Sequence, residues 1–382
     1  MKPIDLLKKS KRIVFKFGTN ALSTDEGELA LSRLYSFLED MAALHAQGKE
    51  ILVVTSGAVG MGRRILGNTD LSDAVSFKQA CAAVGQIGLM KFYEDGFKQL
   101  GITAAQVLLT EDDFANRARY LSLRDTLSRL LELKCIPVIN QNDTVSPNEL
   151  RSYKDQGVKV CFSDNDKLAA LVTAGMDADL LCILSDVDGL YDADPRKNKQ
   201  AQHLHTVYEI TPQIEALGFC ASSRGRGGMK TKLEAAKIVT RSGAAMVISY
   251  GKQPGAVSKL WSADYKGTLF LPTANLPSKK LWLAYATNVA GGIQINAGAV
   301  KALVQKGSSL LPAGIVAVAG EFERGDAVSI LDEKGREIAR GLTHYSSREC
   351  VKIAGCSSQE IAQKIGSKNY DEVVHRDNIV LL

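Results

Sequence analysis

The sequence lacks the short motifs that tie cysteine or histidine to a metal or to a hydrolytic nucleophile. Its seven cysteines form no C-x-x-C pair, and neither H-E-x-x-H nor G-x-S-x-G occurs, so zinc-enzyme and serine-hydrolase classes have no support. Most cysteines lie in apolar runs, and we expect reduced, buried thiols rather than disulfides or a zinc site. They are Cys81, Cys135, Cys161, Cys182, Cys220, Cys350 and Cys356.

Long hydrophobic runs and strong charge are also missing. The start, MKPIDLLKKSKR, lacks the apolar stretch of a signal peptide, and no run approaches the length of a membrane span. These absences predict a cytoplasmic enzyme or binding protein. Lys and Arg number 47 and Asp and Glu 42, so the net charge is +5. This mild excess suits an anionic metabolite as well as nucleic acid and does not choose between them.

What the sequence has is an alternation of short β-rich runs and longer helical patterns. This alternation predicts an α/β fold, with a mainly parallel sheet between helices on both faces. Ligands of such sheets bind at the carboxyl ends of strands, so we expect the site in the residues that follow them. The expected strands are 12–17, 50–56, 103–109, 135–140, 180–185 and 244–249, and the expected helices lie near 28–47, 72–99, 120–133, 164–175 and 229–241.

The composition changes after Gly251. Three prolines follow within a short span, and LPTANLPSKK is typical of a linker. Beyond it, AVSILDEKGREIARG predicts a β-hairpin, which together with GIVAVAG indicates a small β-rich domain of roughly a hundred residues. We therefore expect one domain over 1–270, a linker over 271–280 and a second domain over 281–382. Within the first, the polar segment 141–163 is too long for an ordinary connection and is typical of a lid or binding loop.

The stretch GRGGMKTK, residues 225–232, places three cations where a helix is expected to begin. A helix start carries partial positive charge, so each misplaced cation costs a few tenths of a kcal/mol or more. Lys230 stands where a Walker A loop or a dinucleotide fingerprint needs glycine, so the stretch is neither. Gly227 and Gly228, with flanking cations, could hold phosphate. A flexible basic surface loop is the alternative, and local sequence leaves both open.

Lys16 lies inside an otherwise apolar strand, IVFKFGT. A lysine in a central strand is costly unless it meets an anion near the strand end; the alternative is an edge strand that exposes it. Two lysines from distant segments that converge on one anion would suit phosphoryl transfer, in which catalysis is largely positioning and charge neutralisation.

Other polar residues support or qualify this hypothesis. Asp164, Asn165 and Asp166 exceed what a helix cap requires, and Asp166 could orient the two lysines. Asn140 and Asp143 could receive an ammonium group, although simple turn chemistry explains them equally in isolation. His203 and His205 could ligate a metal, but no third ligand stands at a telling spacing; we expect surface histidines and no dedicated metal site.

Taken in order, the motifs resemble those of the glutamate 5-kinase family, within the amino-acid kinase superfamily. The resemblance runs from about Lys11 to the C-terminus, and the tail, with GSSLLPAGI, GEFERGDAVSI and VHRDN, is similar to the PUA domain that many bacterial members carry. The motifs that carry the resemblance in the first domain are IVFKFGTN, VVTSGAVGMGR, KQACAAVGQ, QVLLT, IPVINQND, SDNDKLAAL, LSDVDGLYDADPR and GRGGMKTKLEAA.

The resemblance implies phosphorylation of the side-chain carboxylate of L-glutamate by ATP, the first step of proline synthesis, in a homo-oligomer inhibited by proline. It implies that Lys16 and Lys232 flank the transferred phosphoryl and that Asp166 organises them. It places Ser56, Gly57, Asn140, Asp143 and Asn165 in the glutamate site. It places Lys16, Ser185, Asp186, Arg226, Gly227, Gly228, Met229, Lys230, Thr231 and Lys232 in the ATP site, with Mg²⁺ held mostly by ATP.

Three positions depart from the family pattern, and two other functions remain alternatives. Gln141 stands where Glu is common, Ser163 where Gly is common, and Arg226 where a small residue usually precedes Gly-Gly. A different amino-acid kinase, such as one that acts on acetylglutamate, is the first alternative. RNA binding through the PUA domain is the second; we do not expect it, because aromatic and basic side chains suited to stacking on bases are sparse after residue 280.

Overall fold

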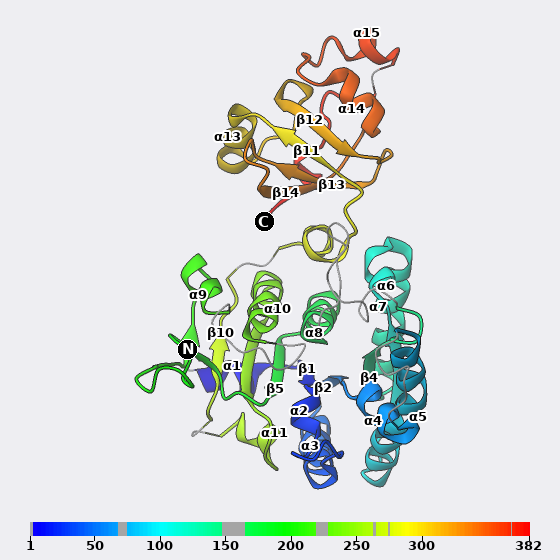
Figure 1. Ribbon diagram of the computed structural model, residues 1–382, viewed down its shortest axis with the longest axis vertical. Coiled ribbons are helices and arrows are strands. Elements are labelled where there is room, and N and C mark those ends of the chain that lie inside the picture. Colours follow the sequence, from blue (N-terminus) through cyan, green and yellow to red (C-terminus); the bar gives the residue numbers. More distant parts are fainter. Residues whose placement is uncertain are drawn as a thin grey trace. The chain divides into compact units, whose positions relative to one another are not determined.

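The computed structural model describes residues 3–67, 75–146, 165–218, 228–262, 265–273, 276–367 and 369–382. Among these, the chain forms two compact units that change over between Leu276 and Pro277 (Figure 1). The changeover falls inside the expected linker at 271–280, although helix α12 already begins at Ser278. Whether each unit folds without the other stays a prediction.

The amino-terminal unit contains the alternating strands and helices that the sequence predicts. Its strands are β1 (Arg12–Phe17), β2 (Glu50–Val54), β3 (Ala104–Leu109), β4 (Ile136–Gln141), β5 (Leu180–Ser185), β6 (Leu190–Tyr191), β7 (His203–Leu204), β8 (Thr206–Val207), β9 (Ala245–Tyr250) and β10 (Thr268–Phe270). Its helices are α1 (Pro3–Lys9), α2 (Thr19–Leu22), α3 (Leu31–Ala46), α4 (Ala58–Leu66), α5 (Val75–Gln99), α6 (Glu111–Ala115), α7 (Arg117–Glu132), α8 (Asn165–Gly175), α9 (Pro212–Leu217), α10 (Met229–Arg241) and α11 (Ala256–Lys259).

Eight of these strands form one sheet in the order β3-β4-β2-β1-β5-β9-β10-β8. Every neighbouring pair is parallel except β9 and β10, so the predicted mainly parallel sheet is confirmed. The chain moves from β1 to β2 on one side and later to β5 on the other. The order therefore reverses at β1, and in such folds ligands bind near this switch point, at the carboxyl ends of the strands.

Helices cover both faces of the sheet, as expected for buried parallel strands. On one face, Phe15 and Phe17 of β1 pack in a core with Phe37 of α3 and Leu89 of α5. On the other face, α8 and α10 lie side by side against β1, β5 and β9 (Figure 1). Because side chains alternate along a strand, Lys16 points to the face opposite Phe15 and Phe17, where α8 and α10 lie.

The expected strands and long helices are all present, with boundaries that shift by up to three residues where they can be compared. The short elements α4, α6, α9 and β10 were not predicted, because three to nine residues give too little periodicity to recognise. The predicted lid segment 141–163 lies mostly outside the described residues, and so does the start of the helix expected from 72. No described helix has the length and hydrophobicity to cross a membrane.

The carboxy-terminal unit is built on a five-stranded sheet in the order β12-β11-β13-β14-β15. The expected hairpin is confirmed, since β13 and β14 pair antiparallel, and GIVAVAG forms β12. Its strands are β11 (Gly291–Ile295), β12 (Ile315–Gly320), β13 (Ala327–Leu331), β14 (Glu337–Leu342) and β15 (Ile379–Leu381). Its helices are α12 (Ser278–Leu281), η3 (Trp282–Ala286), α13 (Ala297–Lys306), η4 (Pro312–Gly314), α14 (Ser347–Ile353), α15 (Ile361–Ile365) and η5 (Arg376–Asn378).

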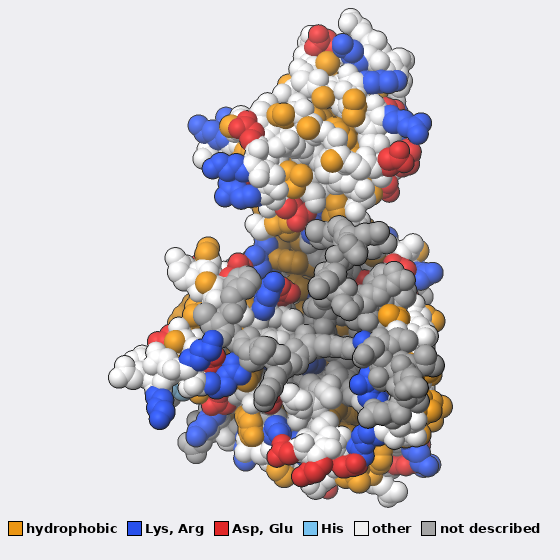
Figure 2. Space-filling view, viewed as in Figure 1, with side chains coloured by type: hydrophobic (Ala, Val, Ile, Leu, Met, Phe, Trp, Pro, Cys, Tyr) orange, Lys and Arg blue, Asp and Glu red, His pale blue; other side chains and the backbone are white. Residues whose placement is uncertain are grey.

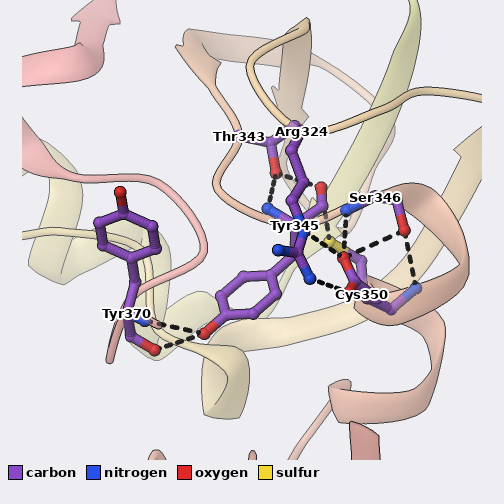
Figure 3. Close-up of polar contacts among 7 residues, drawn as sticks. Arg324, Thr343, Tyr345, Ser346, Cys350 and Tyr370 are labelled. Atoms are coloured by element: carbon purple, nitrogen blue, oxygen red, sulfur yellow. Dashed lines mark hydrogen bonds and ion pairs between the residues drawn. The ribbon is translucent and has the colours of Figure 1, made fainter. Parts of the chain in front are cut away.

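The link between β14 and α14 carries most of the polar contacts drawn in Figure 3. Ser346 caps α14 by accepting from the Glu349 N–H, and Glu349 accepts in return from the Ser346 N–H, which is a capping box. Arg324 forms an ion pair with Glu349 and lies over the Tyr345 ring. Burial raises the pKa of Cys350 to about 12, so this thiol stays protonated at neutral pH.

Other surface and thiol features of the described chain agree with a globular protein. The face of the carboxy-terminal unit seen in Figure 2 carries hydrophobic side chains between charged ones on either side. Five cysteines are described and none forms a disulfide, as expected: Cys81, Cys135, Cys182, Cys350 and Cys356. Cys161 and Cys220 lie outside the described residues.

Candidate active site

Two lysines converge on one buried carboxylate at the carboxyl end of the sheet. Lys16 Nζ lies 2.7 Å from Asp166 Oδ1, and Lys232 Nζ lies 3.1 Å from Asp166 Oδ2. The three side chains are 3%, 6% and 0% exposed for Lys16, Lys232 and Asp166. They come from β1, α10 and α8, elements that are far apart in the sequence. Because β1 pairs with strands on both sides, the alternative of an exposed edge-strand lysine is wrong.

The Lys16–Asp166–Lys232 cluster pairs one carboxylate with two ammonium groups. Burial alone would raise the pKa of Asp166, but the two ammonium groups and their hydrogen bonds outweigh burial and hold that pKa well below its usual range. Asp166 is therefore ionised at neutral pH. Two buried ammonium groups that are fixed side by side stabilise negative charge that develops near them, so the cluster is suited to bind an anion.

Asp166 also explains why a helix can begin among cations. α10 begins at Met229, and its capping residue Gly228 offers no side chain to cap it. Thr231 Oγ1 donates to Asp166 Oδ2 over 3.0 Å, so a carboxylate from α8 stands at the first turn of α10, where negative charge is favourable. Asp166 thus supplies part of the negative charge that offsets the cations at the start of α10.

The other predicted cations are not brought into this cluster. Lys230 is exposed and lies 3.9 Å from Glu234 of its own helix. Arg226 and Gly227 lie outside the described residues, as does Ser163. Of the basic residues in the predicted ATP site, the structure brings only Lys16 and Lys232 to Asp166 among the residues it describes.

Amide side chains form the neighbouring part of the site. Asn165, the first residue of α8, donates from Nδ2 to Ser56 Oγ over 2.7 Å and to Thr55 O over 2.5 Å. It also donates to Asn140 Oδ1 over 3.1 Å, and Asn140 Nδ2 donates to Gln86 Oε1 over 2.8 Å. The structure thus brings together Ser56, Asn140 and Asn165, three of the residues that the resemblance assigns to one site.

The remaining predicted glutamate-site residues flank this amide group. Gly57 caps α4 with a φ of +112°, a conformation that L side chains rarely adopt, so only glycine fits the turn that presents Ser56. Asp143 follows the end of β4 by two residues and is partly exposed. Gln141, which departs from the family pattern, is buried, and its Nε2 has no acceptor within the described chain.

Ser185 and Asp186 lie at the end of β5, next to β1. Ser185 Oγ donates to Asp186 Oδ1 over 3.0 Å, and Asn20 Nδ2 donates to Asp186 Oδ2 over 2.8 Å. Burial opposes ionisation of Asp186, but these hydrogen bonds outweigh it and lower the pKa of its carboxyl group. Both oxygens of this carboxylate therefore already have donors.

No group of three or more metal-ligating side chains occurs among the described residues. His203 and His205 do meet, with their Nδ1 atoms 3.1 Å apart, on the hairpin of β6 and β7. His203 Nε2 lies 3.3 Å from the Asp188 carbonyl oxygen. If His203 donates there, its Nδ1 accepts from His205, so one hydrogen bond accounts for the contact.

Comparison with known proteins agrees with this geometry. The model of the amino acid kinase family matches residues 11–249, and the PUA domain model matches residues 291–365. The glutamate 5-kinase of Caldanaerobacter subterraneus subsp. tengcongensis is 44% identical over 97% of this chain and 98% of its own length. The chain belongs to the glutamate 5-kinase family. The glutamate 5-kinase of Geobacter sp. strain M21 is similarly close, at 45% identity over 99% of both chains.

Membership in this family makes the chain a kinase of the amino-acid kinase fold with a carboxy-terminal PUA domain. Among solved structures, carbamate kinase from Giardia lamblia bound to AMP-PNP covers 69% of this chain and 99% of its own at 14% identity, with a TM-score of 0.47. A similarity at that level adds nothing to the assignment.

Sequence reasoning assigned no role to three polar residues that the structure places at the site. Thr55 offers its carbonyl to Asn165, Asn20 donates to Asp186, and Gln86 accepts from Asn140. Asn20 and Thr55 stand beside strand ends, and this position was a usable signal. Gln86 lies inside a long helix, where nothing local distinguishes it from a solvent-facing glutamine.

Proposed function

We propose that this chain transfers the γ-phosphoryl group of ATP to the side-chain carboxylate of L-glutamate, the first step of proline synthesis. Its products are L-glutamyl 5-phosphate and ADP. Family membership supports the reaction, and one observation carries its mechanism: two buried lysines, Lys16 and Lys232, are fixed by a carboxylate that cannot act as a base. Asp166 is ionised; one of its oxygens forms an ion pair with Lys16, and the other accepts from Lys232 and Thr231.

A carboxylate acceptor needs no base. The glutamate side chain, with an ordinary pKa near 4.3, is already ionised at neutral pH, so no proton has to leave the attacking oxygen. That oxygen forms a bond to the γ-phosphorus while the bond from phosphorus to the bridging oxygen breaks, and the electron pair leaves with ADP. The barrier is then mainly repulsion among anions, which two fixed ammonium groups lower.

In this proposal each part of the site has one task. Lys16 and Lys232 flank the transferred phosphoryl group, and Asp166 holds the two ammonium groups in place. Ser56, Gly57, Asn140 and Asn165 bind the glutamate, and Asp143 pairs with its ammonium group. Ser185, Asp186 and the start of α10 hold the nucleotide; by resemblance the latter runs from Arg226 and Gly227 through Gly228, Met229, Lys230 and Thr231 to Lys232.

Mg²⁺ enters the proposal as the counterion that ATP brings. The carboxylates of Asp166 and Asp186 already accept from lysine, threonine, serine or asparagine donors. Within the described site these side chains do not fit a dedicated metal site, and no step of the mechanism is assigned to one. Omitting Mg²⁺ should therefore weaken ATP binding without changing the protein's thermal stability.

The reaction is tested by ATP turnover with glutamate, N-acetylglutamate and aspartate, with hydroxylamine present to trap an acyl phosphate. We expect hydroxamate only with glutamate. A product with N-acetylglutamate alone would instead support a different amino-acid kinase, for which the side-chain carboxylate is the acceptor in the same way.

Three further properties belong to the proposal because the family resemblance implies them. The chain would form a homo-oligomer, which light scattering after gel filtration measures. Proline would inhibit glutamate turnover, which a proline titration at fixed ATP measures. A cytoplasmic location, expected from the sequence, is checked by cell fractionation.

A further inference from the structure

A chain of side-chain amides runs from the first turn of α8 to α5. Asn165 Nδ2 donates to Asn140 Oδ1, and Asn140 Nδ2 donates to Gln86 Oε1. Each link joins the amino group of one amide to the oxygen of the next, so the chain has a direction. It begins at Asn165, beside the lysine cluster, and ends at the amino group of Gln86.

The amino group of Gln86 has no acceptor among the residues that the structure describes. Gln86 is only 8% exposed, and a buried donor without a partner costs about 1–3 kcal/mol. Reversing the amide brings no relief, because Asn140 Nδ2 would then face another donor. Two N–H bonds of Gln86 are therefore available to a ligand at the end of the chain.

Packing holds Gln86 in this position. It shares one face of α5 with Leu89, Tyr93 and Phe97, the residues that this helix contributes to the core. The amide of Gln86 therefore lies on the apolar, buried face of the helix. The preceding residue, Gly85, lies so close to α4 that a Cβ there would be 1.9 Å from the Ala58 carbonyl oxygen. This contact fixes α5 against the turn that carries Ser56.

We infer that Gln86 Nε2 donates to the α-carboxylate of the glutamate substrate and so helps determine specificity, an inference that rests on the proposed function. The side-chain carboxylate of the substrate must meet Lys16 and Lys232, whose partner Asp166 adjoins Asn165. Gln86 lies two hydrogen bonds beyond Asn165, away from the lysines, where the amino-acid end of the substrate would lie. An α-carboxylate there requires N–H donors.

The test compares L-glutamate with its α-amide, in which the α-carboxylate is a carboxamide and the side-chain carboxylate is unchanged. Gln86→Glu keeps an oxygen that can accept from Asn140 but replaces the amino group with a second carboxylate oxygen. We expect KM for glutamate to rise about 10–100-fold, the range of one charge-assisted hydrogen bond, with kcat little changed. The preference for glutamate over the α-amide should fall by at least the same factor, because the new carboxylate repels one substrate and accepts from the other.

Two further variants make the result decisive. Gln99→Glu makes the same substitution at the exposed end of the same helix and should change neither KM nor the preference. Gln86→Leu removes the donor without adding charge, and it should shift both quantities in the same direction by less. Circular dichroism and thermal melts establish that each variant is folded.

Equal losses with both substrates would show that Gln86 only supports the fold, and an unchanged KM would show that it does not meet the substrate; either result overturns the inference. Failure of the unaltered protein to phosphorylate glutamate would instead refute the proposed function, and the two failures are distinguished by that single assay.

Discussion

Two carboxylates, one in each unit, have similar partners and different surroundings. Asp166 in the amino-terminal unit forms an ion pair with Lys16 and accepts from Lys232 and Thr231. Glu349 in the carboxy-terminal unit accepts from Arg324 and from the hydroxyl and N–H of Ser346. Each stands at the first turn of a helix, where a carboxylate is favourable.

The difference lies in burial and in charge balance. Asp166 is fully buried between two cations, whereas Glu349 is 22% exposed and has one. The Glu349 group is complete: Arg324 offsets its charge, and its contacts with Ser346 satisfy the cap of α14. The Asp166 group holds two ammonium groups on one buried carboxylate. The comparison thus distinguishes an ion pair that stabilises a helix, at Glu349, from a charged cluster that is suited to bind a ligand, at Asp166.

The largest effect should come from Asp166→Asn. Without the carboxylate, two buried ammonium groups face each other, and breaking a buried pair in this way costs about 3–5 kcal/mol of the free energy of unfolding. Glutamate phosphorylation should be lost as well. Urea unfolding measures the first effect. Asp177→Asn, which removes an exposed carboxylate paired with Arg124, is the matched control and should remain within the error of wild type.

The same variant should change the dependence of stability on pH. The pKa of Asp166 is lowered by folding, so its stabilisation is present above the unfolded value of about 3.9 and is lost as the pH falls below it. Unfolding free energy measured between pH 5 and pH 3 should therefore decline less steeply in Asp166→Asn than in wild type. Identical slopes would show that Asp166 is not held by the lysines.

Lys232→Met should separate function from stability. It removes one of two cations from a single carboxylate, which keeps Lys16 and Thr231, so we expect the free energy of unfolding to change by less than in Asp166→Asn. Turnover should fall by roughly 10²–10³-fold, the usual loss for one group that stabilises developing charge, with a smaller change in KM for ATP. Lys237→Met, in the same helix and paired with Glu215, is the control. A destabilised protein with normal turnover would make Lys232 structural.

Asp143→Asn tests a partly exposed carboxylate that is proposed to pair with the ammonium group of the substrate. Loss of one charge-assisted hydrogen bond costs about 1.5–3 kcal/mol, so KM for glutamate should rise by one to two orders of magnitude while KM for ATP stays constant. Asparagine keeps the turn-forming character, so steady-state kinetics distinguish the two interpretations. An unchanged KM would return Asp143 to a role in the turn.

The sequence predicts the role of a site residue when its neighbours in the chain reveal that role, and fails when only a tertiary contact does. Lys16 was recognisable because a charge in a buried strand needs a partner, and Asp166 because three polar residues exceed a cap. Gln86 was not recognisable, since only the tertiary approach of α5 to α4 through Gly85 places it beside Asn140. The contribution of Asp166 to the start of α10 was missed for the same reason, because it joins residues 65 positions apart.

The boundary between the units, between Leu276 and Pro277, lies inside the linker that the sequence predicts. Prolines predicted a linker from Leu271, yet the Thr273 and Leu276 N–H groups donate to the carbonyls of Thr240 and Arg241 at the end of α10. These bonds belong to the amino-terminal unit. A chain ending at Leu276 should therefore fold and phosphorylate glutamate with kcat little changed, and one ending at Leu271 should be less stable. Loss of activity in the folded, longer truncation would refute the independence of this unit.

The smallest effect should come from Arg324→Met, which removes the cation that pairs with Glu349. The arginine is 45% exposed, so water screens its charge, and exposed ion pairs contribute little. After the change, Glu349 still accepts from the Ser346 N–H and hydroxyl, so the cap of α14 remains satisfied. We expect the thermal midpoint and glutamate turnover to match wild type at 0.5 M salt. A clear loss of stability would show that Glu349, like Asp166, depends on its cation, and the distinction between the two carboxylates would fail.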